Sequence, residues 1–104
     1  MDPHRLAELR SLALHEAIGE KLTQTPSLID GARRRLEARA TTLPAAQFYR
    51  DEWIAVLAQP LEGVVAFLRE DSERARALRQ STPFAGVIEP RERWQIWRHV
   101  REGA

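Results

Sequence analysis

The chain has 104 residues, no cysteine, and 16 Lys and Arg against 15 Asp and Glu. A chain of this length fits one domain with a modest core, its balanced charge excludes nucleic-acid binding by bulk charge, and the lack of cysteine excludes disulfides and thiolate chemistry. Because no apolar stretch is long enough to span a membrane and the start lacks a signal-peptide pattern, we expect a soluble, cytoplasmic protein with no membrane contact.

Helix-start signals predict two helices in the first part of the chain. Asp2 can cap free amide groups and Pro3 suits a first helical turn, and the apolar spacing that follows predicts a helix to about Leu22. Thr25 and Pro26 repeat the start signal, and the second helix is expected to end near residue 40. The short "TQTP" connection predicts that the two helices pack as an antiparallel pair.

Four further helices are expected, over residues 44–58, 61–69, 73–80 and 90–101. Pro60 would clash with the carbonyl four residues before it in a continuous helix, so we predict a break there. The aromatic residues Tyr49, Trp53 and Phe67 fall on apolar helix faces and are expected in the core. No segment alternates as a strand would. The sequence therefore predicts an all-α, single-domain bundle of about five to six short helices spanning residues 1–104.

Catalytic, cofactor and metal chemistry find little support in the residue pattern. The nearest approach to a metal site is His15 with Glu16 and Glu20, but His15 points away from Glu16 and has no second histidine one turn on, so we expect a solvated helix surface. The serines lack a glycine elbow or an adjacent base, and no glycine-rich phosphate loop is present. We predict a protein without enzymatic activity, cofactor or metal.

A basic ridge lies on the second predicted helix, in "GARRRLEAR". Its members are Arg33, Arg34, Arg35 and Arg39. Such a ridge could follow a phosphate backbone. Alternatively, Asp30 and Glu37 make it an ordinary charged face with pairs along the helix, which we favour because no helix-turn-helix glycine precedes it.

The stretch "STPFAGVIEP" has turn residues and a surplus of apolar side chains. Pro83 fixes one backbone angle and Gly86 allows a positive one. The surplus apolar residues are Phe84, Val87 and Ile88, which either tuck under the loop as part of the core or form a patch that a partner covers. Both alternatives are open from the sequence.

The final predicted helix combines tryptophan with arginine. Trp94 and Trp97 are bracketed by Arg91, Arg93 and Arg98. Tryptophan and arginine are enriched at interface hot spots. Docking of a terminal helix on its own bundle explains the two tryptophans equally well.

Two strings in the chain are similar to those of a known group of proteins: "LALHEAIGEKL" with "PSLIDGARRRLEAR", and "ALRQSTPFAGVIEPRERWQIWR". They resemble a family of small bacterial helical proteins associated with antitoxins, which are encoded beside a toxin such as a nucleotidyltransferase. The resemblance covers most of the chain and implies an interaction protein with a toxin as its partner. It assigns no role to any single residue.

These observations predict an antitoxin-like module that binds and neutralises a protein partner, with residues 81–104 as the binding segment. The predicted contact residues are Phe84, Val87, Ile88, Arg91, Arg93, Trp94, Trp97 and Arg98. The alternatives are a DNA-binding regulator that uses the basic ridge and a helical accessory subunit of an enzyme. A homodimer is also compatible with spare apolar faces.

Overall fold

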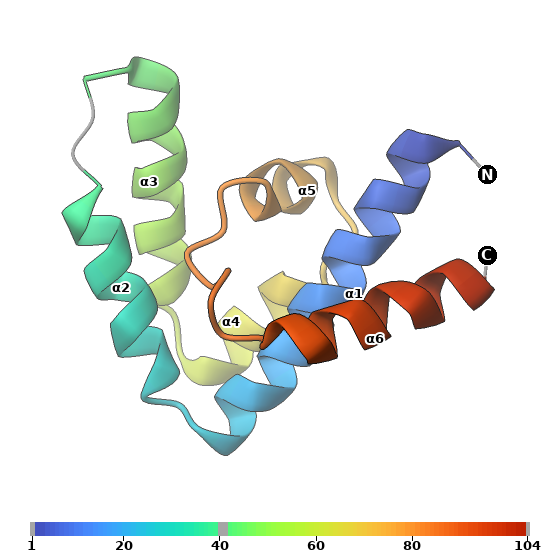
Figure 1. Ribbon diagram of the computed structural model, residues 1–104. Coiled ribbons are helices and arrows are strands. Elements are labelled where there is room, and N and C mark those ends of the chain that lie inside the picture. The colour runs from blue at the N-terminus through green and yellow to red at the C-terminus, as the bar shows by residue number, and fades with distance from the viewer. Residues whose placement is uncertain (1, 40–41, 104) are drawn as a thin grey trace.

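The computed structural model describes residues 2–39 and 42–103, and within them it contains six helices and no strand (Figure 1). The helices are α1 (Pro3–Gln24), α2 (Leu28–Ala38), α3 (Pro44–Leu57), α4 (Leu61–Arg69), α5 (Glu73–Arg79) and α6 (Pro90–Gly103). The prediction of a small all-α domain is confirmed, and the predicted breaks at 60 and 81–89 both separate helices.

The helices begin where capping groups are available. The Asp2 side chain accepts a hydrogen bond from the His4 amide at 3.2 Å, and the Ser72 hydroxyl accepts one from the Ala75 amide at 3.1 Å. Each bond satisfies an amide group that the first turn of a helix leaves free. Pro60 directly precedes α4, where its missing amide hydrogen does no harm.

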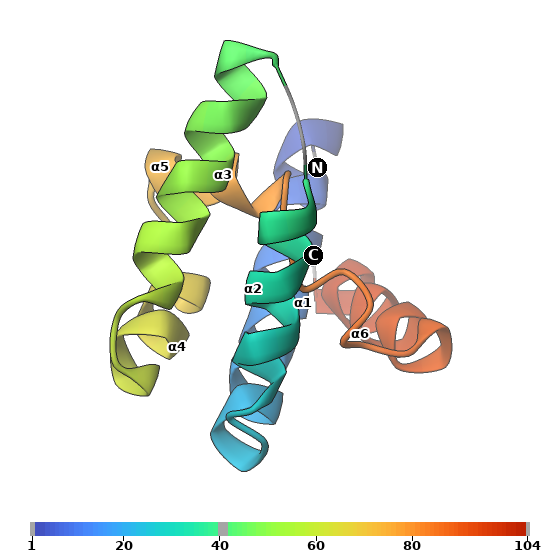
Figure 2. The same cartoon turned by 90° about the vertical axis from the view of Figure 1, so that its left-hand side faces the viewer.

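The first two helices do not form the predicted antiparallel pair. They diverge from the turn between them, so that α2 lies beside α3, while α1 packs against α4, α5 and α6 (Figures 1 and 2). The buried face of α1 includes Ile18, Gly19 and Leu22. A Cβ atom at Gly19 would lie 3.4 Å from Cγ1 of Val65, at ordinary van der Waals distance, so α4 lies directly against this turn of α1. The best apolar partner of α1 is therefore α4, and a short connection alone does not make a pair.

The core is built around Trp53 of α3. Its indole Nε1 donates to the Leu78 carbonyl at 2.8 Å, and its ring meets Phe67 and Phe84 edge-on at centroid distances of 5.7 and 6.1 Å. Such geometry is favourable for aromatic pairs. The expectation that Trp53 and Phe67 are core residues is confirmed, and Tyr49 is half-buried at the edge of the core. Phe84 joins them from the loop between α5 and α6.

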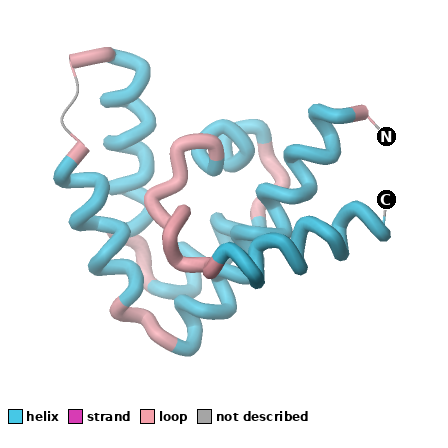
Figure 3. The backbone as a smooth tube through the Cα atoms, in the orientation of Figure 1, coloured by secondary structure: helices cyan, strands magenta, loops and turns pink. Residues whose placement is uncertain are grey.

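Three arginines hold the loop of residues 80–89, which crosses in front of the helices in Figure 3. Arg35 Nε donates to the Pro83 carbonyl at 2.7 Å. Arg39 donates to the carbonyls of Ser81 and Thr82 at 2.8 and 3.1 Å, and Arg93 Nη2 donates to the Ala85 carbonyl at 2.6 Å. We call Arg35, Arg39 and Arg93 the arginine clamp. It supplies the donors that the irregular backbone needs.

The loop turns without a left-handed glycine. No described residue has a positive φ, so the loop does not use the positive backbone angle that Gly86 allows. The turn is instead closed by a hydrogen bond from the Val87 amide to the Phe84 carbonyl at 3.0 Å. A Cβ atom at position 86 would meet nothing within 4 Å, so glycine is not required there.

Helix α6 lies on the outside of α1 and contains no buried residue. Its inner side includes Ile96, which packs partly buried against the core. An ion pair between Lys21 Nζ and Glu92 Oε2 at 3.2 Å joins α6 to α1. The last helix is thus attached along one side and leaves its other side open.

Candidate partner-binding surface

The loop residues predicted as partner contacts belong to the core. Phe84 is fully buried and Ile88 is 2% exposed, while Val87 is half-buried and packs against the core cluster. Phe84 fits against the Trp53 ring, and the arginine clamp satisfies the backbone on either side of it. Of the two alternatives left open by the sequence, the structure shows the tucked one. Phe84 and Ile88 are therefore removed from the candidate surface.

The outward side of α6 carries an exposed tryptophan and three exposed arginines. We define the α6 outer face as Arg91, Trp94, Arg98 and Arg101, which follow each other one turn apart and are all exposed. Trp94 is 58% exposed, and the Arg98 guanidinium lies 5.4 Å above its ring. Arg98 Nε also pairs with Glu102 at 3.0 Å. The face thus presents a large aromatic ring surrounded by positive charge.

Trp97 is both a tether and a partial surface residue. The guanidinium groups of Arg10 and Arg93 lie 5.8 and 6.0 Å from its ring, and 37% of the residue is exposed. Arg93 belongs to the arginine clamp as well, so it connects the loop, α6 and the Trp97 ring. Trp97 therefore docks α6 on the bundle, as one interpretation of the sequence predicts, whereas Trp94 is mostly exposed and its role in binding stays a prediction.

Another exposed apolar site, which the sequence analysis missed, lies at the start of α3. Phe48 is as exposed as Trp94, at 58%, and touches Tyr49 edge-on at 5.5 Å. Shallow grooves flank Tyr49 on both sides, one toward Arg39 and one toward α5. In the sequence, Phe48 follows the spacing of an apolar face, and only the packing shows that this turn of α3 extends past the core.

The predicted basic ridge is mostly used inside the protein. Arg33 donates to the Leu57 carbonyl at 3.0 Å and pairs with Asp30 at 3.7 Å. Arg35 and Arg39 belong to the arginine clamp. Among the described residues only Arg34 of this set has no hydrogen-bond or ion-pair partner. Because guanidinium groups occupied by carbonyls are poorly placed to contact phosphates, the geometry does not favour the nucleic-acid alternative.

His15 is buried, contrary to the expectation of a solvated surface. It is 1% exposed, and its Nδ1 lies 2.7 Å from the Ser11 carbonyl oxygen. Burial lowers the pKa of His15 to about 4, so the imidazole is neutral near pH 7. The part of the chain that the structure describes holds neither a cluster of three or more metal-ligating side chains nor a helix long and apolar enough to cross a membrane.

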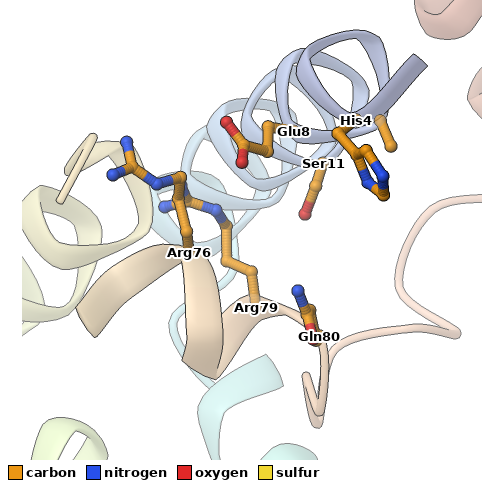
Figure 4. A pocket seen from close by; sticks show the side chains of 7 residues that line it. His4, Glu8, Ser11, Arg76, Arg79 and Gln80 are labelled. Atoms are coloured by element: carbon orange, nitrogen blue, oxygen red, sulfur yellow. The ribbon is translucent and has the colours of Figure 1, made fainter. Parts of the chain in front are cut away.

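A polar cavity of about 170 Å³ lies between α1 and α5 (Figure 4). It is lined by His4, Ala7, Glu8, Ser11, Arg76, Arg79 and Gln80. Arg79 is buried, and burial lowers the pKa of its guanidinium. The sequence contained one signal: Arg79 shares the spacing of the core residues Ala75 and Leu78, so an arginine stands where an apolar side chain is expected.

No family model, curated protein or solved structure matches this chain. The resemblance to antitoxin-associated proteins accordingly stays a prediction from the sequence.

Proposed function

We propose that the protein is an interaction module that binds a partner protein through the α6 outer face and holds that partner inactive, as an antitoxin does. The observation that carries the proposal is Trp94, which is 58% exposed on a helix with no buried residue. An exposed tryptophan surrounded by arginine has the composition of an interface hot spot. The family resemblance supports the antitoxin role, and the cysteine-free sequence supports action in the cytoplasm.

The charge of α6 defines the chemistry of the partner. The helix has four arginines and two glutamates, and both glutamates are already paired, Glu92 with Lys21 and Glu102 with Arg98. Arg91 and Arg101 form no ion pair within the described residues. A fitting partner therefore has an apolar pocket for the Trp94 ring with carboxylates around it, which guanidinium groups can bind in a bidentate manner.

The direct test is binding and activity of the candidate partner encoded by the adjacent gene. We expect Trp94→Ala to weaken its binding about thirtyfold or more, as loss of a hot spot of about 2 kcal/mol does. Phe48→Ala is the matched control, because Phe48 is equally exposed but lies on α3. Affinity is measured by calorimetry, and the partner's activity is assayed with each variant. The wild type should inhibit that activity and Trp94→Ala should release it.

Each contrary result identifies a different alternative. Equal losses from Trp94→Ala and Phe48→Ala, or no loss from Trp94→Ala, would show that the α6 outer face is not the contact. Stimulation of the partner would indicate an accessory subunit of an enzyme. Self-association alone would indicate a homodimer, and capture of nucleic acid that salt releases would indicate the regulator.

A further inference from the structure

An open groove lies between α1 and α6, beside the α6 outer face. Its volume is about 420 Å³. Small apolar and acidic side chains of both helices line it, and we define the α1–α6 groove by six of them: Ala13, Glu16, Ala17, Glu20, Glu92 and Ile96. Because the two alanines leave this part of α1 without long side chains, a flat aromatic ring can lie against the helix.

The groove carries more negative charge than the neighbouring side chains pair. Glu92 forms an ion pair with Lys21 at 3.2 Å. Glu16 and Glu20 are exposed, and neither forms an ion pair within the described residues. The other ionisable group that lines the groove is His99. The groove therefore offers two carboxylates to a cationic partner.

The α6 outer face has the complementary composition. Its Trp94 ring is 58% exposed, and Arg91 and Arg101 form no ion pair within the described residues. Arg98 pairs with Glu102, but both side chains are more than half exposed, and such surface pairs are weak. This face thus matches the groove in both respects, with an aromatic ring for the alanines and guanidinium groups for the carboxylates.

The spacing of the charges matches as well. Glu16 and Glu20 are four residues apart, which is about 6 Å along a helix. Arg98 and Arg101 are three residues apart, about 4.5 Å along α6. Two arginines of the outer face can therefore face both glutamates at the same time.

The geometry requires that the face and the groove come from different copies of the chain. The outer face points away from α1, and α6 lies at the edge of the molecule (Figure 2). The two surfaces adjoin each other, because Gln95 lines the groove and is within one turn of Arg91 and Arg98. Adjoining surfaces can be exchanged around a two-fold axis, and closed two-fold dimers are the commonest oligomers.

We propose that the protein forms a two-fold dimer in which the α6 outer face of each copy lies in the α1–α6 groove of the other. Trp94 lies against Ala13 and Ala17 of the second copy, and the arginines bind the two glutamates of that groove. The dimer covers the face that binds the partner protein, so its regulatory consequence rests on the proposed function: the partner has to displace the second copy. Self-association itself does not depend on that function.

Sedimentation equilibrium of the protein alone tests the dimer. We expect a reversible dimer at concentrations from about 10 µM to about 1 mM, the range of weak, transient interfaces. The dissociation constant should rise about tenfold or more between about 0.1 M and about 1 M sodium chloride, because the Debye length falls from about 10 Å to about 3 Å. A protein that stays monomeric over this range, or a dimer that salt does not weaken, would overturn the proposal.

Reciprocal charge reversal identifies the two surfaces. The groove variant is Glu16→Lys with Glu20→Lys, and the face variant is Arg98→Glu with Arg101→Glu. Each alone should dimerise more than about tenfold more weakly than the wild type, because like charges then meet at both contacts. An equimolar mixture of the two variants should restore a dimer with one copy of each, because opposite charges meet again. A mixture that stays monomeric would contradict the assignment.

A third variant controls for net charge. Glu37→Lys with Glu62→Lys makes the same charge change as the groove variant at exposed positions on α2 and α4. It should dimerise on its own, and it should associate with the face variant less than the groove variant does. Equal association of both mixtures would mean attraction by net charge alone and would overturn the proposal. Circular dichroism checks that each variant keeps its helices.

Partner binding separates this dimer from the proposed function. The groove variant keeps the α6 outer face, so it should bind the partner at least as tightly as the wild type while it no longer dimerises. Dimerisation as described without any partner binding would contradict the proposed function alone. Partner binding that Trp94→Ala abolishes, by a protein that is always monomeric, would contradict the dimer alone.

Discussion

The loop of residues 80–89 and helix α6 follow each other in the chain, and both carry apolar side chains next to arginines. They differ in how deeply those apolar side chains are buried. Phe84 in the loop is fully buried, whereas Trp94 on the helix is 58% exposed. The arginines differ in the same way. The loop receives three of them on its backbone carbonyls, while α6 turns Arg91, Arg98 and Arg101 to the solvent.

The contrast shows how backbone hydrogen bonding decides which apolar segment is buried. An irregular loop cannot enter a core unless its carbonyls find donors, and here Arg35, Arg39 and Arg93 provide them. A helix satisfies most of its backbone internally and needs no such help, so α6 can stay on the surface. Its attachment rests on Trp97, Ile96 and the ion pair of Lys21 with Glu92.

The largest expected effect is at the centre of the loop. Phe84→Ala should lower the free energy of unfolding by about 3–5 kcal/mol, because it leaves a cavity beside Trp53. Urea unfolding followed by the fluorescence and circular dichroism of the protein measures this loss. Gly86→Ala in the same loop is the control, since its new methyl group meets nothing within 4 Å. A small effect of Phe84→Ala would mean that the loop is not part of the core in solution.

Low pH should weaken the packed interior because α1 contains a buried neutral histidine. The pKa of His15 is about 4 in the folded protein and 6.5 when unfolded, so the unfolded chain takes up the proton first. The contribution of His15 to the free energy of unfolding should therefore be fully present above pH 6.5 and fall as the pH drops from 6.5 to 4. Below pH 4 this group should cause no further loss. The full loss is roughly 3 kcal/mol. Urea unfolding at a series of pH values measures it.

The His15→Gln variant isolates that contribution. Glutamine keeps a donor for the Ser11 carbonyl but does not titrate, so its stability curve should be flatter between pH 4 and 6.5. Asp71 remains in the variant; the hydrogen bond from Arg76 lowers its pKa, so its contribution is lost in more acid conditions. Identical curves for the wild type and His15→Gln would show that His15 is open to solvent.

The sequence predicted the helices because their causes are local. Asp2, Pro44, Pro60, Ser72 and Pro90 each act within one turn of a helix start, and all six predicted helices are present. It also placed Trp53 and Phe67 correctly, because their faces are apolar. The antiparallel pairing of α1 and α2 failed because short connections limit neighbours but do not choose among apolar faces.

The sites were harder to predict because their causes are distant in the chain. Burial of Phe84 depends on Arg35, which is 48 residues from the carbonyl it contacts. His15 and Arg79 did carry a local signal: each shares the helical spacing of buried neighbours, Ile18 for the first and Ala75 for the second. A polar residue at a core position was thus visible. Whether Trp94 or Ile96 faced the bundle was not, since either side of α6 could have docked.

Two neighbouring arginines on α2 allow a direct comparison of an arginine that bonds the loop backbone with one that faces the solvent. Arg35→Met should lower the free energy of unfolding by about 1–2 kcal/mol, because it leaves the Pro83 carbonyl without its donor. Arg34→Met should change it by less than about 0.5 kcal/mol, as surface substitutions usually do. Thermal and urea unfolding measure both. Equal effects would mean that Arg35 stabilises the fold through charge or helix propensity, which both arginines share, and not through the loop.

The smallest expected effect on stability is at Trp94, and a small effect is what a surface contact residue should show. Trp94→Ala should change the free energy of unfolding by less than about 0.5 kcal/mol, since the ring is mostly exposed and its cation–π contact is with Arg98 of the same helix. Trp97→Ala should cost more, because its ring also meets Arg10 and Arg93, and cation–π contacts at exposed sites contribute about 0.5–1 kcal/mol each. Urea unfolding ranks the two variants. A small loss would mean that Trp94 contributes little to the fold, which leaves its side chain available for binding. A loss at Trp94 equal to that at Trp97 would instead mean that both tryptophans anchor α6. The α6 outer face would then have no large apolar residue that is free of a structural role.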